Sequence, residues 1–140
     1  MRLTKQQRTA LHGKYGGRCA YCGCDLGDRW HADHIEPVVR NDWIKRFGME
    51  VRPPTFPERD TLENHNPACA PCNISKGSLP LESWRAWLAG HVESLNLYTP
   101  IYRMVKKFGL IQETGAPVLF FFETWNPEHV AAAAIGESHE

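Results

Sequence analysis

Four of the five cysteines in this 140-residue chain form two Cys-x-x-Cys pairs. Four thiolates at such spacings can hold a tetrahedral zinc ion, and a closed four-thiolate site has no open position for chemistry. The two pairs are separated by 46 residues, so we expect the zinc to act as a structural clasp at the base of a long insert. Buried free thiols are the alternative, as is Cys24 replacing Cys22. The expected ligands are Cys19, Cys22, Cys69 and Cys72.

The insert contains an Asp-His dipeptide, Asp33-His34. A carboxylate suits a hard ion such as Mg²⁺ or Mn²⁺, and a histidine can accept a proton from water near neutral pH. Hydrolysis of a phosphodiester uses both functions. Adjacent side chains on a regular strand point to opposite faces, so the pair can share one site only if the strand ends there. An exposed polar pair is the alternative interpretation.

Two residues after the second cysteine pair could complete such a site. Asn73 directly follows Cys72, and its amide oxygen is a suitable second ligand for a hard cation. Lys76 lies three residues further along the same short helix, where it could contact a DNA phosphate. We expect Arg18, beside the first cysteine pair, to contact phosphate as well.

Taken together, these motifs resemble the His-Asn-His (HNH) endonucleases, in particular phage-type members of their zinc-containing branch. The resemblance covers residues 15–78. It implies an α+β fold with a small ββα-metal nuclease core and a structural zinc held by four cysteines, flanked by helices and a C-terminal β-hairpin. The motifs that carry it are Cys19-x-x-Cys22, Asp33-His34-Ile35-x-Pro37, Glu63-Asn64, Pro67-Ala68-Cys69-x-x-Cys72-Asn73 and Lys76-Gly77.

The resemblance also implies a role for each matching residue. His34 would be the general base, and Asn64 would orient it. Asp33 and Asn73 would bind the catalytic divalent ion, which is Mg²⁺, Mn²⁺ or another ion. The substrate would be DNA, cleaved by nicking or by a double-strand break. The Pro-rich connection over residues 38–60 is longer than the short Gly-rich link of many members, which leaves the second strand harder to place.

Periodicity and capping residues indicate the elements that must position these side chains. We expect a single domain over residues 1–125, with the core at about 15–78, an extension over 79–125, and an acidic flexible tail over 126–140. The expected helices span residues 4–15, 71–76, 80–90 and 100–108, with one turn over 42–47. A strand is expected over 29–36 and a hairpin over 110–123.

The net charge is zero, but its distribution is uneven. Residues 1–20 hold five basic residues and no acid, so this segment could bind phosphates, although a solvated helix face explains the charge equally well. No apolar run approaches the roughly 18 residues of a membrane span. The N-terminus has no apolar signal segment, and we expect a cytoplasmic protein, in the host cytoplasm if phage-encoded.

Two other functions fit the same residues. The chain could be a non-catalytic zinc module that binds DNA or protein, with the polar residues incidental. It could also be an accessory to phage packaging proteins that keeps a nuclease fold for docking.

Overall fold

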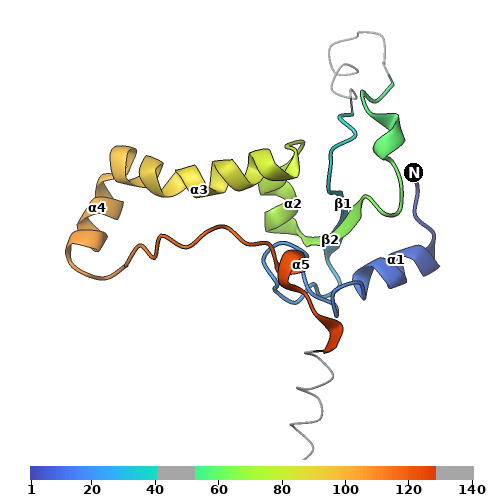
Figure 1. Cartoon of the computed structure of the whole chain (residues 1–140), viewed down its shortest axis with the longest axis horizontal. Helices are drawn as coiled ribbons and strands as arrows, with labels where there is room; N and C mark the ends of the chain where they lie inside the picture. Colours follow the sequence, from blue (N-terminus) through green and yellow to red (C-terminus); the bar gives the residue numbers. More distant parts are fainter. Residues whose placement is uncertain (41–52, 129–140) are drawn as a thin grey trace, which may run out of the picture. The chain divides into compact units, whose positions relative to one another are not determined.

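The computed structural model describes residues 1–40 and 53–128 (Figure 1). It divides into two compact units, Met1–Ser78 with Leu119–Glu140, and Leu79–Val118, and each is described here by itself. No helix in the described parts of the chain is long and apolar enough to span a membrane. The elements are α1 (Lys5–His12), β1 (Trp30–His34), the 3₁₀ turn η2 (Pro57–Arg59), β2 (His65–Cys69), α2 (Ala70–Lys76), α3 (Leu81–Tyr98), α4 (Pro100–Lys107) and α5 (Phe121–Thr124).

The first unit is built on a two-stranded antiparallel sheet. Strands β1 and β2 pair from Trp30 opposite Cys69 to His34 opposite His65, and α2 begins at the residue after β2. Helix α2 therefore starts from the sheet end that carries Cys69, as Figure 1 shows. Helices with a small sheet are the α+β class that the sequence predicted.

Local capping explains where α1 begins. The Thr4 hydroxyl accepts from the Gln7 backbone N–H, and the Gln7 side chain accepts from the Thr4 N–H, which forms a capping box. The helix ends at His12, three residues earlier than predicted, and a turn leads into the first cysteine pair. Directly after Cys22, Gly23 has φ +78°, and an added Cβ would lie 2.9 Å from the Phe121 ring. Glycine is therefore required at this position.

The predicted hairpin over residues 110–123 is wrong. Residues 112–120 form no regular structure, and the Phe-rich run ends in the short helix α5. The backbone N–H groups of Phe121 and Phe122 donate to the carbonyls of Tyr21 and Ala20. Phe120 is 2% exposed, with its ring centroid 5.5 Å from that of Tyr21. The apolar run thus reflects packing against the first cysteine turn, which a strand-like pattern could not distinguish.

The second unit consists mainly of α3 and α4. Helix α3 continues to Tyr98, past Gly90, where the sequence analysis ended it. An interior glycine costs a helix about 1 kcal/mol, which is too little to stop it here. The α4 helix matches its predicted range to within one residue. Glu113 holds this unit together by accepting hydrogen bonds from Asn96, Tyr102 and Lys106. The turn predicted over 42–47, and residues 129–140 of the tail, lie outside the described residues.

Candidate functional site

The four predicted cysteines come together. Their four Sγ atoms all lie within 4.8 Å of one another, and those of Cys22 and Cys69 are 3.8 Å apart. Backbone bonds fix the two pairs: the Cys69 N–H donates to the Cys19 sulfur, and the Ala20 N–H donates to the Pro67 carbonyl. These four side chains could hold a metal ion such as zinc. The cluster members are Cys19, Cys22, Cys69 and Cys72.

The cysteine thiols influence one another's protonation. A hydrogen bond from Cys72 lowers the pKa of Cys19 to about 4, while the same contact raises the pKa of Cys72. Burial, followed by contacts with Cys22 and Cys69, raises the pKa of Cys24 to about 12. Cys24 is not one of the four grouped thiols, so the geometry agrees with the spacing argument for Cys22 as the ligand.

Asp33 and His34 face opposite sides of β1. Asp33 is 5% exposed, and its carboxylate accepts a hydrogen bond from the Tyr21 hydroxyl. The Lys76 ammonium lies 3.3 Å from the same carboxylate oxygen and also donates to the His34 backbone carbonyl, at 2.6 Å. Burial raises the pKa of Asp33, and the positive charge of Lys76 opposes that rise. The pair therefore joins β1 to α2 inside the protein.

Lys76 is fully buried, so the prediction that it contacts a DNA phosphate is wrong for this structure. Its ammonium group neutralises the charge of the Asp33 carboxylate. Lys76 lies on a short helix, as predicted, but its spacing does not reveal which face of that helix packs on the sheet. Arg18, by contrast, is exposed, and its guanidinium donates to the Gly23 carbonyl.

The buried ion pair between Lys76 and Asp33 should contribute to stability. Lys76→Met should destabilise the first unit by about 3–5 kcal/mol, because it leaves the Asp33 carboxylate buried without its cation. The deficit should shrink as the pH falls and Asp33 becomes protonated, since burial raises the pKa of this carboxyl. Urea unfolding, followed by hydrogen exchange of the β1 and β2 amides, measures the effect. Exposed Lys107→Met is the matched control; equal stability of the two variants would contradict the buried pair.

On the other face of β1, His34 is held by Asp60. The His34 Nε2 lies 2.9 Å from Asp60 Oδ1, and the His34 side chain is 14% exposed. Hydrogen bonds from the Met1 amino group and then from His34 lower the pKa of Asp60 to about 2. The carboxylate is therefore ionised and can only accept, so Nε2 carries the ring proton. This leaves Nδ1 as the basic nitrogen of the neutral His34 imidazole.

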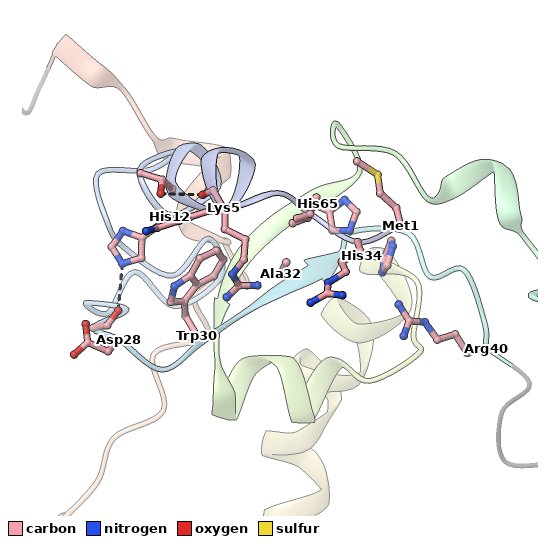
Figure 2. Close-up of a pocket in the computed structure, with 14 residues that line it drawn as sticks. Met1, Lys5, His12, Asp28, Trp30, Ala32, His34, Arg40 and His65 are labelled. Carbon is pink, nitrogen blue, oxygen red and sulfur yellow. Dashed lines mark hydrogen bonds between the residues drawn. The ribbon is translucent and has the colours of Figure 1, made fainter.

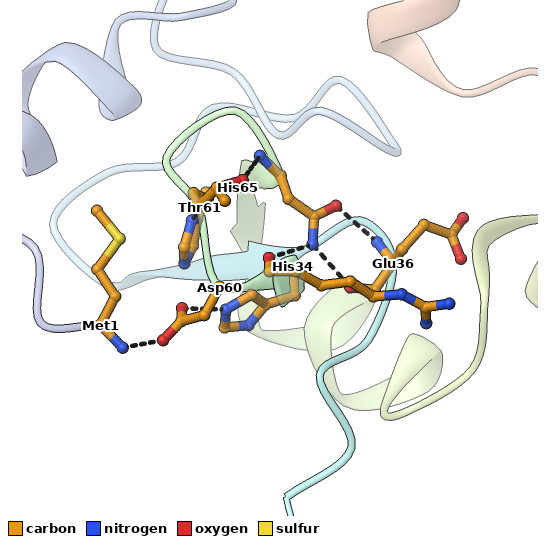
Figure 3. A network of polar contacts seen from close by, with 8 residues as sticks. Met1, His34, Glu36, Asp60, Thr61 and His65 are labelled. Atoms are coloured by element: carbon orange, nitrogen blue, oxygen red, sulfur yellow. Dashed lines mark hydrogen bonds and ion pairs between the residues drawn. The ribbon is translucent and has the colours of Figure 1, made fainter. Parts of the chain in front are cut away.

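His65 lies directly beside His34. Their ring centroids are 4.3 Å apart, as expected for partners in the strand register, and His65 is 3% exposed. The His65 Nδ1–H donates to the Thr61 carbonyl, which fixes the tautomer of its neutral ring (Figure 3). Burial lowers the pKa of His65, so the neutral form is favoured.

Asn64 braces the loops around His34 rather than its ring. Its amide nitrogen donates to the carbonyls of Glu36 and Arg59, both at 2.8 Å, and its amide oxygen accepts from the Glu36 N–H. Figure 3 shows these bonds linking the segment after β1 to the segment before β2. Asn64 therefore helps to position His34 through the backbone, while Asp60 orients the imidazole.

His34 opens into a pocket of about 820 Å³ with a cationic lining. Helix α1 supplies Lys5 and Arg8, and the guanidinium of Arg8 lies over the Trp30 ring at 4.3 Å. The single acidic side chain among the lining residues is Asp28. Figure 2 shows the basic side chains and His34 around this hollow. Positive groups around a potential base create a place where a phosphate can bind. The basic lining residues are Arg2, Lys5, Arg8 and Arg40.

Asn73, the second predicted metal ligand, is half-buried on α2 directly after Cys72. Its assignment and that of Asp33 stay predictions. In this arrangement Asp33 does not fit the role of ligand, because its carboxylate is buried and holds the Lys76 ammonium. A divalent ion at the same oxygen would meet strong repulsion from that ammonium.

Sequence reasoning missed Asp60 and His65. Asp60 follows a Pro-rich connection with no local pattern, so its contact with His34 is visible only in three dimensions. His65 could have been found, because pairing Trp30 with Cys69 in an antiparallel register also pairs His34 with His65. Comparison with known proteins identifies no relative: no family model, curated protein or solved structure matches the chain significantly.

Proposed function

We propose that this chain is a metal-dependent DNA endonuclease that hydrolyses phosphodiester bonds with His34 as the general base. The observation that carries the proposal is the Asp60–His34 pair at the edge of a cationic pocket. An ionised carboxylate on one ring nitrogen leaves the other nitrogen basic, which suits proton abstraction from water. The motif resemblance to HNH endonucleases supports the same reaction and adds the expected products, a 5′-phosphate and a 3′-hydroxyl.

The basic groups of the pocket would bind the substrate. The side chains of Arg2, Lys5 and Arg8 would contact backbone phosphates without reading sequence, and Arg18 would extend this contact. The stacking of Arg8 on Trp30 holds its guanidinium in place before the substrate arrives. Because these contacts are ionic, binding should weaken as salt concentration rises.

Catalysis would then proceed in a single displacement. His34 would take a proton from the attacking water through Nδ1, and Asp60 would stabilise the positive imidazolium that forms. The bond between phosphorus and the 3′ oxygen would break as the water oxygen attacks, and the leaving 3′ oxygen would take a proton from solvent water. A divalent ion would supply charge stabilisation at the phosphate, and Mg²⁺ or Mn²⁺ is the expected class. Because Asp33 does not fit the ligand role in this arrangement, no step here depends on it.

Zinc would serve as the structural partner of this site. Bound to the four cysteines, it would join the first turn to the start of α2 and so support the strand pairing that places His34. In this proposal β1, β2 and α2 would form the ββα core that the resemblance implies, with the structural zinc supporting it.

A supercoiled plasmid assay tests the proposal. The purified protein should convert the plasmid to nicked or linear product in Mg²⁺ or Mn²⁺, and added salt should suppress the reaction. Absence of cleavage across a range of divalent ions, with DNA binding retained, would favour the non-catalytic zinc module. Cleavage only after addition of a packaging partner would favour the accessory role.

Asp60 allows a test of how His34 is oriented. Asp60→Asn should lower the cleavage rate by about 10- to 100-fold, because an amide can hold the wrong imidazole tautomer and cannot stabilise the imidazolium. The pH profile of the remaining activity should also differ from that of the unmodified protein, because the negative charge beside the imidazole is gone. Exposed Glu58→Gln in the neighbouring 3₁₀ turn is the control. An unchanged pH profile in Asp60→Asn would mean that Asp60 is merely structural.

A further inference from the structure

His34, Asp60 and His65 place three metal-ligating groups around one point. One ligand atom from each lies within 4.8 Å of the other two, a separation that a single ion can bridge. The groups come from two strands and a turn that the sheet register and Asn64 hold together. Figure 3 shows the contact between His34 and Asp60, and the centroid of the His65 ring lies 4.3 Å from that of the His34 ring. The spacing therefore belongs to the fold and does not depend on a flexible surface.

Hydrogen bonds to neighbouring groups leave a ligand atom of His65 and of Asp60 oriented for metal binding. The Thr61 carbonyl fixes the proton of His65 on Nδ1, so Nε2 of the neutral ring carries the lone pair. Histidine ligands in metal sites commonly donate their other N–H to a carbonyl in this way. The second oxygen of Asp60 is bonded to the Met1 amino group, which leaves Oδ1 toward His34. The pocket gives an ion access from solvent.

We infer that these three residues form a second metal site, selective for Zn²⁺ and similar ions, and that its occupancy switches off the base. Two imidazoles and one carboxylate suit Zn²⁺, Co²⁺ or Ni²⁺ and leave an open position, whereas Mg²⁺ prefers oxygen ligands. The surrounding arginines and lysine oppose a cation, so an anion such as phosphate at the open position would strengthen binding.

Metal binding would change which ring nitrogen of His34 carries the proton. Without the ion, Nε2 carries the proton that Asp60 accepts, and Nδ1 is basic. When Zn²⁺ binds Nε2, the proton moves from Nε2 to Nδ1 and the ion takes the Asp60 oxygen, so no proton is gained or lost. His34 then has no lone pair for water. This inhibitory role rests on the proposed function, but the metal site itself does not.

Metal titration of the full-length chain tests the site without any activity assay. With the cysteine cluster already zinc-loaded, isothermal titration with Co²⁺ should reveal one further equivalent, and its absorption should lack strong thiolate bands. Asp60→Asn and His65→Gln should each weaken this second equivalent by at least about tenfold. His31→Gln, an exposed histidine on β1, is the control. Two ligand variants guard against a folding defect in either one.

The possible results distinguish failure of the metal site from failure of the proposed nuclease function. A single bound equivalent, or unchanged Co²⁺ affinity in both ligand variants, overturns the site. If the protein cleaves DNA in Mg²⁺, Zn²⁺ added beyond the first equivalent should inhibit it, and His65→Gln should be less sensitive relative to its own rate without added Zn²⁺. Binding of the second equivalent without inhibition overturns the switch. A second equivalent in a protein that never cleaves DNA supports the site and rejects the proposed function.

Discussion

Replacement of His34 by alanine is expected to lower plasmid cleavage by about 10²–10⁴-fold while leaving the fold intact. The variant loses the only group that the proposal uses to deprotonate water. Its structural cost should be small, because the side chain lies at a pocket edge and its main polar partner, Asp60, is itself partly exposed. Water can therefore solvate the Asp60 carboxylate once the imidazole is gone.

The measurement is single-turnover cleavage in Mg²⁺, paired with DNA-binding affinity and urea unfolding of the same preparation. Affinity should stay within a few fold, since the cationic lining residues that bind phosphate are unchanged. His31→Ala on the same strand is the control, because that histidine is exposed. Full activity in His34→Ala would refute the mechanism, and loss of folding in this variant would move the question to His34→Gln.

Parts of the fold governed by short-range chemistry could be predicted from the sequence. The cysteine cluster followed from two local spacings, and α1 and α4 followed from capping residues and apolar periodicity. The alternation of side chains along a strand also predicts that Asp33 and His34 point to opposite faces of β1, as they do. Each of these patterns spans only a few residues, although the cluster also requires two cysteine pairs 46 residues apart to meet.

Parts that depend on tertiary packing could not be predicted in this way. The burial of Lys76 depends on which side of α2 packs on the sheet, and lysine side chains are usually exposed. The Phe-rich run looked like a strand because both strands and packed coil require apolar side chains. Asp60 reached His34 across 26 residues of sequence, where no periodicity operates. The candidate base was therefore predictable, whereas its orienting partner was not.

We expect zinc in the cysteine cluster to hold the first unit together, so that removing the ion should unfold this unit. Structural zinc contributes roughly 10–16 kcal/mol to the folding of zinc-finger peptides, which is comparable to the net stability of about 5–15 kcal/mol of a whole domain. Cys69→Ser should therefore lose the bound ion and the hydrogen-exchange protection of β1, β2 and α2. Cys24→Ser is the matched control, because this exposed thiol lies outside the cluster. Metal content by mass spectrometry and hydrogen exchange measure both effects.

The position of Cys69 explains why this loss should reach the face of the sheet that carries His34. Cys69 is the last residue of β2 and pairs with Trp30, while the other end of the same register pairs His65 with His34. Releasing the cysteine end allows the two strands to separate, and the histidine pair separates with them. Cys69→Ser should thus lose both protection and cleavage, whereas His34→Ala should lose cleavage alone. Retained metal and protection in Cys69→Ser would mean that hydrophobic packing around Tyr21 and Phe120, rather than the metal, holds the unit together.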